Sequence, residues 1–224
     1  MRNQSDTTSG IRYLLASVEQ KSAVLEFLLR NFIPNEPISA ALQMEDADAA
    51  PIMTLIVEET VGSPVTFVAL NSEEEIVGCR LSQVVDLDQK RQQLEKVEKK
   101  PSNWTKKTMQ IETFLDMLLS GMDNHLADRN RALKLEAVCV RNDYQRRGIA
   151  LKLMELTIAA AREEKCDVVM VTATARNSQE LFEKKLGFLT FRTILHKDYK
   201  DEDGQQIFRC ADGTDCGKAM YKFL

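Results

Sequence analysis

The first third of the chain has the hydrophobic periodicity of one strand followed by two helices. "IRYLLAS" (11–17) indicates a strand, and "VEQKSAVLEFLLRNF" (18–32) places apolar residues at helical spacing. The two prolines of "IPNEPI" (33–38) interrupt this helix, because proline lacks the N–H that a helix interior needs. A second helix is predicted over 47–62, with Pro51 in its first turn.

The middle of the chain predicts a β-hairpin and then an insertion. Two apolar runs around a polar turn, "TFVALNSEEEIVGCRLSQVVD" (66–86), are typical of a hairpin. Residues 87–130 are first charged and then helical, which indicates a helical insertion beside a sheet. Its apolar residues favour packing against the core, and the alternative is that some of them wall a ligand pocket. They are Trp104, Met109, Phe114, Met117, Leu118 and Met122.

A strand, a helix and a second strand follow in the pattern of a βαβ unit. "ALKLEAVCV" (132–140) predicts a strand, and residues 147–165 predict a strongly amphipathic helix. "DVVMVTAT" (167–174) is nearly all apolar, as strands buried on both faces are. The two strands are therefore expected to be parallel neighbours in one sheet.

The chain closes with a short helix and two antiparallel strands. The helix is predicted over "SQELFEKKLGF" (178–188), and the strands over 189–199 and 216–224. The fold class is therefore mixed α/β. We expect residues 1–10 to be a flexible polar tail and residues 11–224 to form a single domain.

Composition and charge narrow the classes of partner. The 224 residues are 44% hydrophobic, enough for a sizeable core, and the formal charge is only -4. This balance gives no bulk attraction to nucleic acid or to an anionic membrane. No apolar run is long enough to span a bilayer, and "MRNQSDTTSG" lacks the apolar segment of a signal peptide. We expect a cytoplasmic protein without nucleic-acid or membrane partners, as a monomer or weak homodimer.

Cysteines and histidines give little support for a metal site. The five cysteines are scattered without a CxxC pair, which is typical of reduced thiols. His125 and His196 are the only histidines, so no metal is expected, and both are predicted to lie at the surface. No cysteine or serine is paired with a histidine in the sequence pattern, which disfavours a covalent acyl-enzyme.

A basic turn at the start of a helix is the strongest chemical signal in the sequence. In "VRNDYQRRGIALKLM" (140–154), Arg146, Arg147 and Gly148 lie between a strand and a helix. N–H groups at a helix start and the helix dipole stabilise an anion there, and glycine allows close approach of the backbone. The stretch therefore predicts a phosphate site.

The spacing of this turn resembles the Q/R-x-x-G-x-G/A signature of the GNAT superfamily of N-acetyltransferases. "LFEKKLGF" matches the second landmark of that family, and the order of predicted elements agrees from 11 to 224. The resemblance implies the GNAT acyl-CoA N-acyltransferase fold, with a central, mixed but mostly antiparallel, twisted sheet flanked by helices. The signature residues are Gln145, Arg146, Arg147, Gly148, Ile149 and Ala150.

The same resemblance implies where the cosubstrate acetyl-CoA binds. Its pyrophosphate would lie on the backbone of 145–150, and its pantetheine arm along a strand edge at Val138, Cys139 and Val140. Asn177 and Phe182, in the region of the second landmark, are also expected to contact the cofactor. From its residue type alone, Cys139 is expected to be a buried small thiol.

A narrower resemblance concerns the acceptor. "NFIPNEPI" is similar to a stretch of the insect and nematode arylalkylamine N-acetyltransferase-like group, which acetylates dopamine, tyramine, octopamine, tryptamine and serotonin. In that group the glutamate of this stretch is the proposed base and two hydroxyl residues assist. The matching residues here are Glu36, Thr174 and Ser178. The resemblance favours a small arylalkylamine, with a polyamine or other small amine as the alternative.

Several assignments stay open at this stage. Glu136, expected on one strand face with Val138 and Val140, is a rival for the base, and Ser178 is equally explained as a helix cap. Many family members have a tyrosine where Phe182 stands, so the proton donor to the thiolate is unassigned. One extra residue between "LF" and "LGF" leaves the helix register open. A non-catalytic CoA-binding module remains the third functional class.

Overall fold

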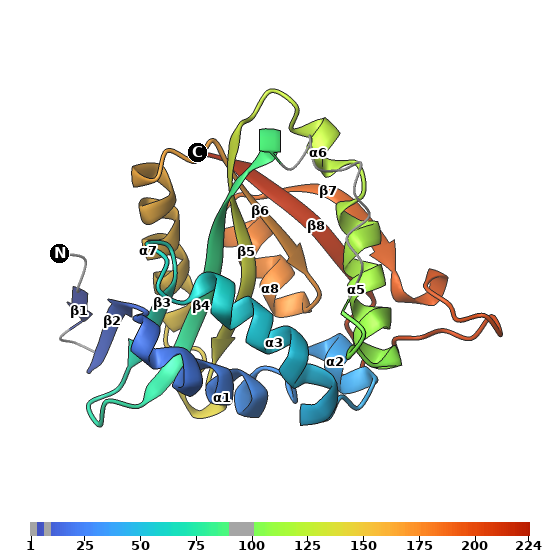
Figure 1. Ribbon diagram of the computed structural model, residues 1–224, viewed down its shortest axis with the longest axis horizontal. Helices are drawn as coiled ribbons and strands as arrows, with labels where there is room; N and C mark the ends of the chain where they lie inside the picture. Colours follow the sequence, from blue (N-terminus) through green and yellow to red (C-terminus); the bar gives the residue numbers. More distant parts are fainter. Residues whose placement is uncertain (1–3, 7–9, 90–100) are drawn as a thin grey trace.

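A single mixed sheet forms the centre of the computed structural model, which describes residues 4–6, 10–89 and 101–224 (Figure 1). The strand order is β1-β2-β3-β4-β5-β6-β8-β7, and only β5 and β6 are parallel neighbours. The predicted fold class is therefore confirmed. The strands are β1 (Gln4–Asp6), β2 (Ile11–Leu15), β3 (Phe67–Leu70), β4 (Ile76–Asp86), β5 (Arg131–Val140), β6 (Val168–Ala173), β7 (Leu189–Leu195) and β8 (Cys216–Phe223).

Helices cover both faces of this sheet (Figure 1). The helix α7 follows β5 and packs against β3 and β4 on one face of the sheet. The helices α1 and α3 pack against the opposite face. The α-helices are α1 (Lys21–Asn31), α2 (Pro37–Ala41), α3 (Asp46–Thr60), α5 (Lys106–Leu119), α6 (Met122–His125), α7 (Ile149–Glu163) and α8 (Arg176–Glu180). Shorter turns are η1 (Val18–Gln20), η2 (Asn142–Tyr144), η3 (Leu181–Lys185) and η4 (His196–Asp198).

Most predicted elements are present, and three differ. Gln4–Asp6 pairs antiparallel with β2, so this part of the expected tail is a strand. Pro51 lies in the interior of α3, because the helix begins at Asp46 through a capping box with Glu45. The break over 33–38 contains the start of an unpredicted helix, α2, whose first residue is Pro37. Proline is well suited to that position because its fixed φ is helical.

The predicted insertion contributes to the core through α5. Phe114 and Leu118 of α5 are fully buried against strands β6 and β8, while Met117 is 42% exposed. Ile111, Leu115 and Leu119 lie on another face of α5 and line a cavity. Of the six residues named from the sequence, Phe114, Leu118 and Met122 are in the core, and Trp104, just before α5, lines the cavity. Residues 90–100 of the insertion lie outside the described part of the chain.

The burial pattern of α5 predicts opposite outcomes at two adjacent positions. Leu118→Ala is expected to lower the free energy of unfolding by about 2–5 kcal/mol, because it leaves a cavity between α5 and the sheet. Met117→Ala is the matched control and is expected to change it by less than about 0.5 kcal/mol. Urea unfolding of both variants measures the difference. Equal effects would show that α5 does not pack as described.

Candidate active site

The ladder between β5 and β6 ends halfway along both strands. Ala132 to Leu135 of β5 pair with Val168 to Val171 of β6, and no pairing is present beyond them in the described chain. At the same level the β4–β5 register shifts, so that Glu136 is an extra residue in β5. Such a bulge bends a strand away from its neighbour. The two parallel strands therefore separate and leave a gap in the middle of the sheet.

Backbone N–H groups of β5 point into this gap. The N–H of Arg141 donates to the carbonyl of Val77 in β4, on the opposite edge of β5. Because the direction of the N–H alternates along a strand, the N–H groups of Val138 and Val140 point away from β4. They lie on the edge that faces the gap. An extended ligand can pair with this edge as an added strand would.

A cavity of about 920 Å³ opens at the gap and reaches both faces of the sheet. Its part on the α7 face, here called the donor half, is lined by Arg80, Val138, Val171, Ala173 and Phe182. The part on the opposite face, the acceptor half, lies among α2, α3, α5 and the separated strands. Two ligands can therefore meet through the sheet.

Glu36 lies in the acceptor half and is held by donors on both carboxylate oxygens. It is the N-cap of α2: Oε2 accepts from the backbone N–H of Ser39 at 2.7 Å and from its hydroxyl at 2.6 Å. Oε1 accepts from Thr174 Oγ1 at 2.7 Å. The side chain is 7% exposed and lines the cavity. Two residues that the family resemblance implied as parts of one catalytic set, Glu36 and Thr174, are thus in direct contact.

Ser39 was missed at the sequence level. It lies three residues after Glu36, which is the spacing of an N-cap and its N3 partner, so the capping pattern could have found it. Ser178 lines the same cavity without a hydrogen bond in the described structure. It is the third residue of α8, whose N-cap is Ala175, so the prediction that Ser178 caps the helix is wrong.

The extra residue before "LGF" is accommodated by a π-helical turn, η3. The N–H of Leu186 donates to Leu181 five residues earlier, and such a turn absorbs one inserted residue without breaking the helix. Phe182 in this turn is buried and packs on Phe188 with ring centroids 5.0 Å apart. Phe182 lines the donor half but has no proton to donate.

Glu136 also reaches the acceptor half, but it is already paired. Its Oε1 lies 2.8 Å from Nζ of Lys134 and accepts from Nε2 of Gln83 at 2.7 Å. The expectation that Glu136 shares a face with Val138 and Val140 is wrong, because the bulge moves its side chain to the face of Lys134. Burial by itself would lower the pKa of Lys134. The negative charges of Glu136, Glu112 and Glu59 outweigh this effect and raise that pKa above its usual value.

Further carboxylates line the outer part of the acceptor half. Glu59 of α3 and Glu112 and Asp116 of α5 lie beside apolar residues that include Phe32 and Trp104. They come from segments far apart in the sequence, so no local pattern indicated them. The acceptor half therefore combines apolar walls with negative charge, which suits a cationic ligand with an apolar body.

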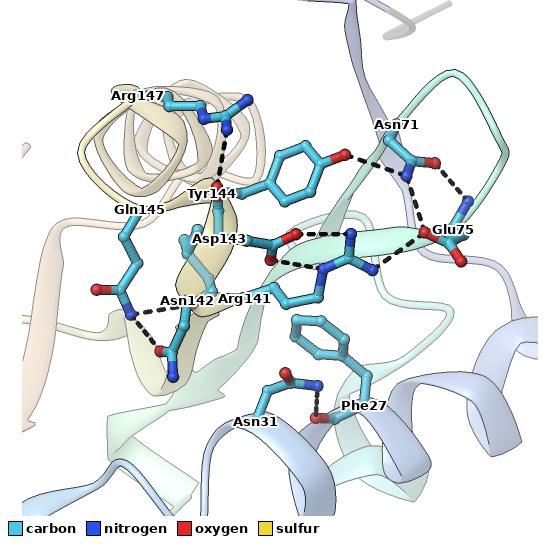
Figure 2. Close-up of polar contacts among 11 residues, drawn as sticks. Phe27, Asn31, Asn71, Glu75, Arg141, Asn142, Asp143, Tyr144, Gln145 and Arg147 are labelled. Atoms are coloured by element: carbon cyan, nitrogen blue, oxygen red, sulfur yellow. Dashed lines mark hydrogen bonds and ion pairs between the residues drawn. The ribbon is translucent and has the colours of Figure 1, made fainter.

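A polar network holds in place the basic turn that was predicted to bind phosphate (Figure 2). Arg141 pairs with Asp143 at 2.8 Å and with Glu75 at 3.1 Å, and its guanidinium stacks on the ring of Tyr144. Asp143 holds the pKa of Arg141 above its ordinary value through these hydrogen bonds. The Tyr144 hydroxyl accepts from Asn71. The turn is thereby tied to the β3–β4 hairpin.

The first four signature residues, 145–148, form an exposed loop with an unusual backbone. Gly148 has φ +80°, and an added Cβ would meet nothing within 4 Å, so glycine is needed for its conformation and the space beside it is open. Arg146 also has positive φ, at 60°. Arg147 donates to the carbonyl of Asp143 at 2.8 Å. The Gln145 side chain donates to Asn142 and Val140.

The start of α7 offers backbone donors beside this loop. The first helical bond runs from the N–H of Lys152 to the carbonyl of Gly148, so the N–H groups of Ile149 and Ala150 point out of the helix. The Ile149 side chain is buried in the core, and only its backbone can serve a ligand. A helix start with these donors suits an anion.

The remaining predicted cofactor residues differ in exposure. Cys139 is buried in the cluster with α1 and α3, and burial holds its pKa well above the usual range. Its side chain therefore faces away from the gap, as expected of a structural thiol. Asn177 is exposed on α8.

One histidine contradicts the sequence prediction. His196 is 1% exposed, packed against Phe114 and Phe208, and its Nδ1 lies 3.6 Å from Cys210 Sγ. A cysteine and a histidine are thus paired in space after all. Burial, with Asp212 and Glu36 adding to it, raises the pKa of Cys210 to about 12, so the thiol stays protonated. The pair borders a separate cavity at the start of β8.

Comparison with known proteins decides the family. Residues 23–188 match the model of the acetyltransferase (GNAT) family. The chain belongs to this family. It is therefore an acyltransferase by family. No match is found among curated proteins.

No helix in the described residues is long and apolar enough to cross a membrane.

Solved structures of acetyltransferases share the fold over nearly the whole chain. Polyamine N-acetyltransferase of Drosophila melanogaster is 23% identical, covering 96% of this chain and 100% of its own, with a TM-score of 0.79. Arylalkylamine N-acetyltransferase 2 of Aedes aegypti is 22% identical, covering 95% and 98%, with a TM-score of 0.78. An agmatine N-acetyltransferase is 22% identical, covering 96% of this chain and 100% of its own, with a TM-score of 0.80. At these identities the likeness shows the fold.

Proposed function

We propose that this acyltransferase moves the acetyl group of acetyl-CoA directly to the primary amine of a small molecule. The observation that carries the proposal is the Glu36–Thr174 hydrogen bond of 2.7 Å inside a cavity that opens at the β5–β6 gap. It places an oriented carboxylate next to the edge where the family's cosubstrate would pair. The amine and the thioester then meet through the sheet.

The transfer needs one proton acceptor and one site for negative charge. An alkylammonium is not a nucleophile until it loses a proton, which Glu36 accepts directly or through water. The amine nitrogen then attacks the thioester carbon, and the resulting oxyanion is held by the gap-facing N–H of Val138 or Val140. Collapse re-forms the C=O bond and breaks the C–S bond, so that the thiolate leaves with the electron pair. The nitrogen loses its second proton to water or, through a hydroxyl, to that thiolate. Thr174 keeps Glu36 oriented, and Ser178 is the nearby hydroxyl that can return a proton.

The walls of the acceptor half support an arylalkylamine as the acceptor. Phe32 and Trp104 provide apolar and aromatic surface, while Glu36 takes the ammonium. A polyamine or other diamine is the second candidate. Glu59, Glu112 and Asp116 favour it, because they offer negative charge for a second ammonium at the outer end of the cavity.

Thiol release from acetyl-CoA with tyramine, dopamine, tryptamine, spermidine and a lysine peptide tests the acceptor. Release with the aromatic amines alone is the expected result. Faster thiol release with spermidine would favour a polyamine or other diamine as the acceptor. CoA binding without release on any acceptor would contradict the proposal and favour a non-catalytic CoA-binding module.

Replacing the two candidate bases separates their roles. Glu36→Gln removes the proton acceptor but keeps a side chain of the same size at the cap of α2. It is expected to lower kcat by roughly 10²–10⁴ while the Kd for CoA stays unchanged. Glu136→Gln is the matched control and is expected to have a smaller effect, because Glu136 is engaged by Lys134. Steady-state kinetics and calorimetry measure both, and the reverse order would identify Glu136 as the base.

The α7 start is expected to bind the pyrophosphate of acetyl-CoA. The double variant Arg147→Glu, Gly148→Glu places negative charge at the helix start and strains its backbone, so calorimetric binding of acetyl-CoA should be lost. Arg147→Glu alone should weaken binding without the strain. Arg162→Glu, an exposed change at the other end of α7, is the control and should bind normally. Equal affinity in all variants would exclude this cofactor site.

A further inference from the structure

Arg80 is an unusual residue in the donor half. It lies in the middle of β4 and is 1% exposed, yet it lines the cavity at the gap. Its Nε and Nη2 are buried without a hydrogen-bond acceptor among the described residues. A buried charge without a partner is costly, so such groups are rare in places where packing alone decides the residue. A methionine or leucine would fill the position at lower cost.

The guanidinium has no ion-pair partner within reach in the described structure. Glu136 attracts the charge of Arg80 and opposes the effect of burial on its pKa, but the hydrogen bonds of that carboxylate are to Lys134 and Gln83. Burial lowers the pKa of Arg80 to about 9, and the side chain is still cationic at neutral pH. The positive charge is therefore desolvated, and it is only partly compensated, by a carboxylate that does not hydrogen-bond to it. In such surroundings its field extends into the cavity with little screening.

The position of Arg80 relates it to the reacting end of the donor. Arg80 is the direct cross-strand partner of Val138, so both side chains lie on one face of the sheet. That face is the one covered by α7, because a Cβ on Gly78, two residues away, would meet Ile149 and Leu153. The backbone of Val138 is the proposed oxyanion site. Phe182 lines the same half of the cavity.

We propose that Arg80 stabilises the negative charge that passes from the thioester oxygen to the leaving thiolate during transfer. This inference rests on the proposed acetyl transfer. When the amine nitrogen bonds to the thioester carbon, the C=O electron pair moves to oxygen. When the C–S bond breaks, the charge moves to sulfur. A fixed cation that is not neutralised by a counter-ion favours both charged states over the neutral thioester. It stabilises the thiolate by its charge, whereas Phe182, without a hydroxyl, cannot protonate that thiolate.

A transient charge suits Arg80 better than a permanent one. A two-point contact with a carboxylate on the acyl chain would need two of the guanidinium nitrogens, but Nε and Nη2 are sealed from solvent. An electrostatic effect on the thioester needs no such contact. The two cases differ experimentally, because a permanent carboxylate would make the enzyme prefer a donor such as succinyl-CoA.

The test compares Arg80→Met, Arg80→Lys and the surface control Arg162→Met. Arg80→Met should raise Tm by roughly 2–4 °C, since it replaces an unpaired buried charge with an apolar side chain. It should also lower kcat about 10²-fold with the Kd for CoA unchanged. Arg80→Lys keeps a positive charge and should retain most of kcat. Arg162→Met should change neither quantity. Thiol release, calorimetry and thermal unfolding provide the readouts.

Three results would overturn the inference. One is an unchanged kcat in Arg80→Met. The second is a joint fall of Tm, CoA affinity and kcat in that variant, which would indicate a structural role. The third is faster turnover of succinyl-CoA than acetyl-CoA that depends on Arg80. Arg80→Gln decides the case if Arg80→Met is not recovered folded. No thiol release by the unchanged protein would instead refute the acetyl transfer and, with it, this inference.

Discussion

The separation of β5 and β6 is the constraint on which the site depends. Two parallel strands share a ladder at one end of the sheet, and the bulge at Glu136 turns β5 away from β6 beyond Leu135. Backbone groups in the middle of a sheet are then left for a ligand, although an interior strand normally has none to offer. The cavity, its access from both faces and the gap-facing N–H groups all follow from this interruption of hydrogen bonding.

The proposed base, Glu36, is positioned by two kinds of contact. Locally, Glu36 caps α2 through Ser39, which orients the carboxylate at a helix start. At long range, Thr174 at the end of β6 donates to the other oxygen across 138 residues of sequence. Because β6 also borders the gap, the hydrogen bond links the base to the strand that separates from β5. The cap contacts with Ser39 orient the Glu36 carboxylate, and the hydrogen bond from Thr174 fixes it beside β6.

Charge is divided between the two halves of the cavity. Carboxylates from α2, α3, α5 and β5 gather where the cationic amine would enter. The unpaired Arg80 lies on the other face, where negative charge would form during transfer. In the proposed reaction, the carboxylates would attract the ammonium, and Arg80 would stabilise the oxyanion and the thiolate.

Local patterns in the sequence were sufficient for the elements, because periodicity, prolines and helix starts act over a few residues. The hairpin, the βαβ unit, the phosphate loop and the contact partners Glu36 and Thr174 were all identifiable, the last two through a family resemblance. Helix α2 was missed although its N-cap and Pro37 are local signals. The pairing of His196 with Cys210, the face of Glu136 and the isolation of Arg80 were not identifiable. Each depends on register or on neighbours from distant segments, and a one-residue bulge is enough to change which face a side chain occupies. The tertiary structure alone decided which carboxylate is engaged and which cation is left without a partner.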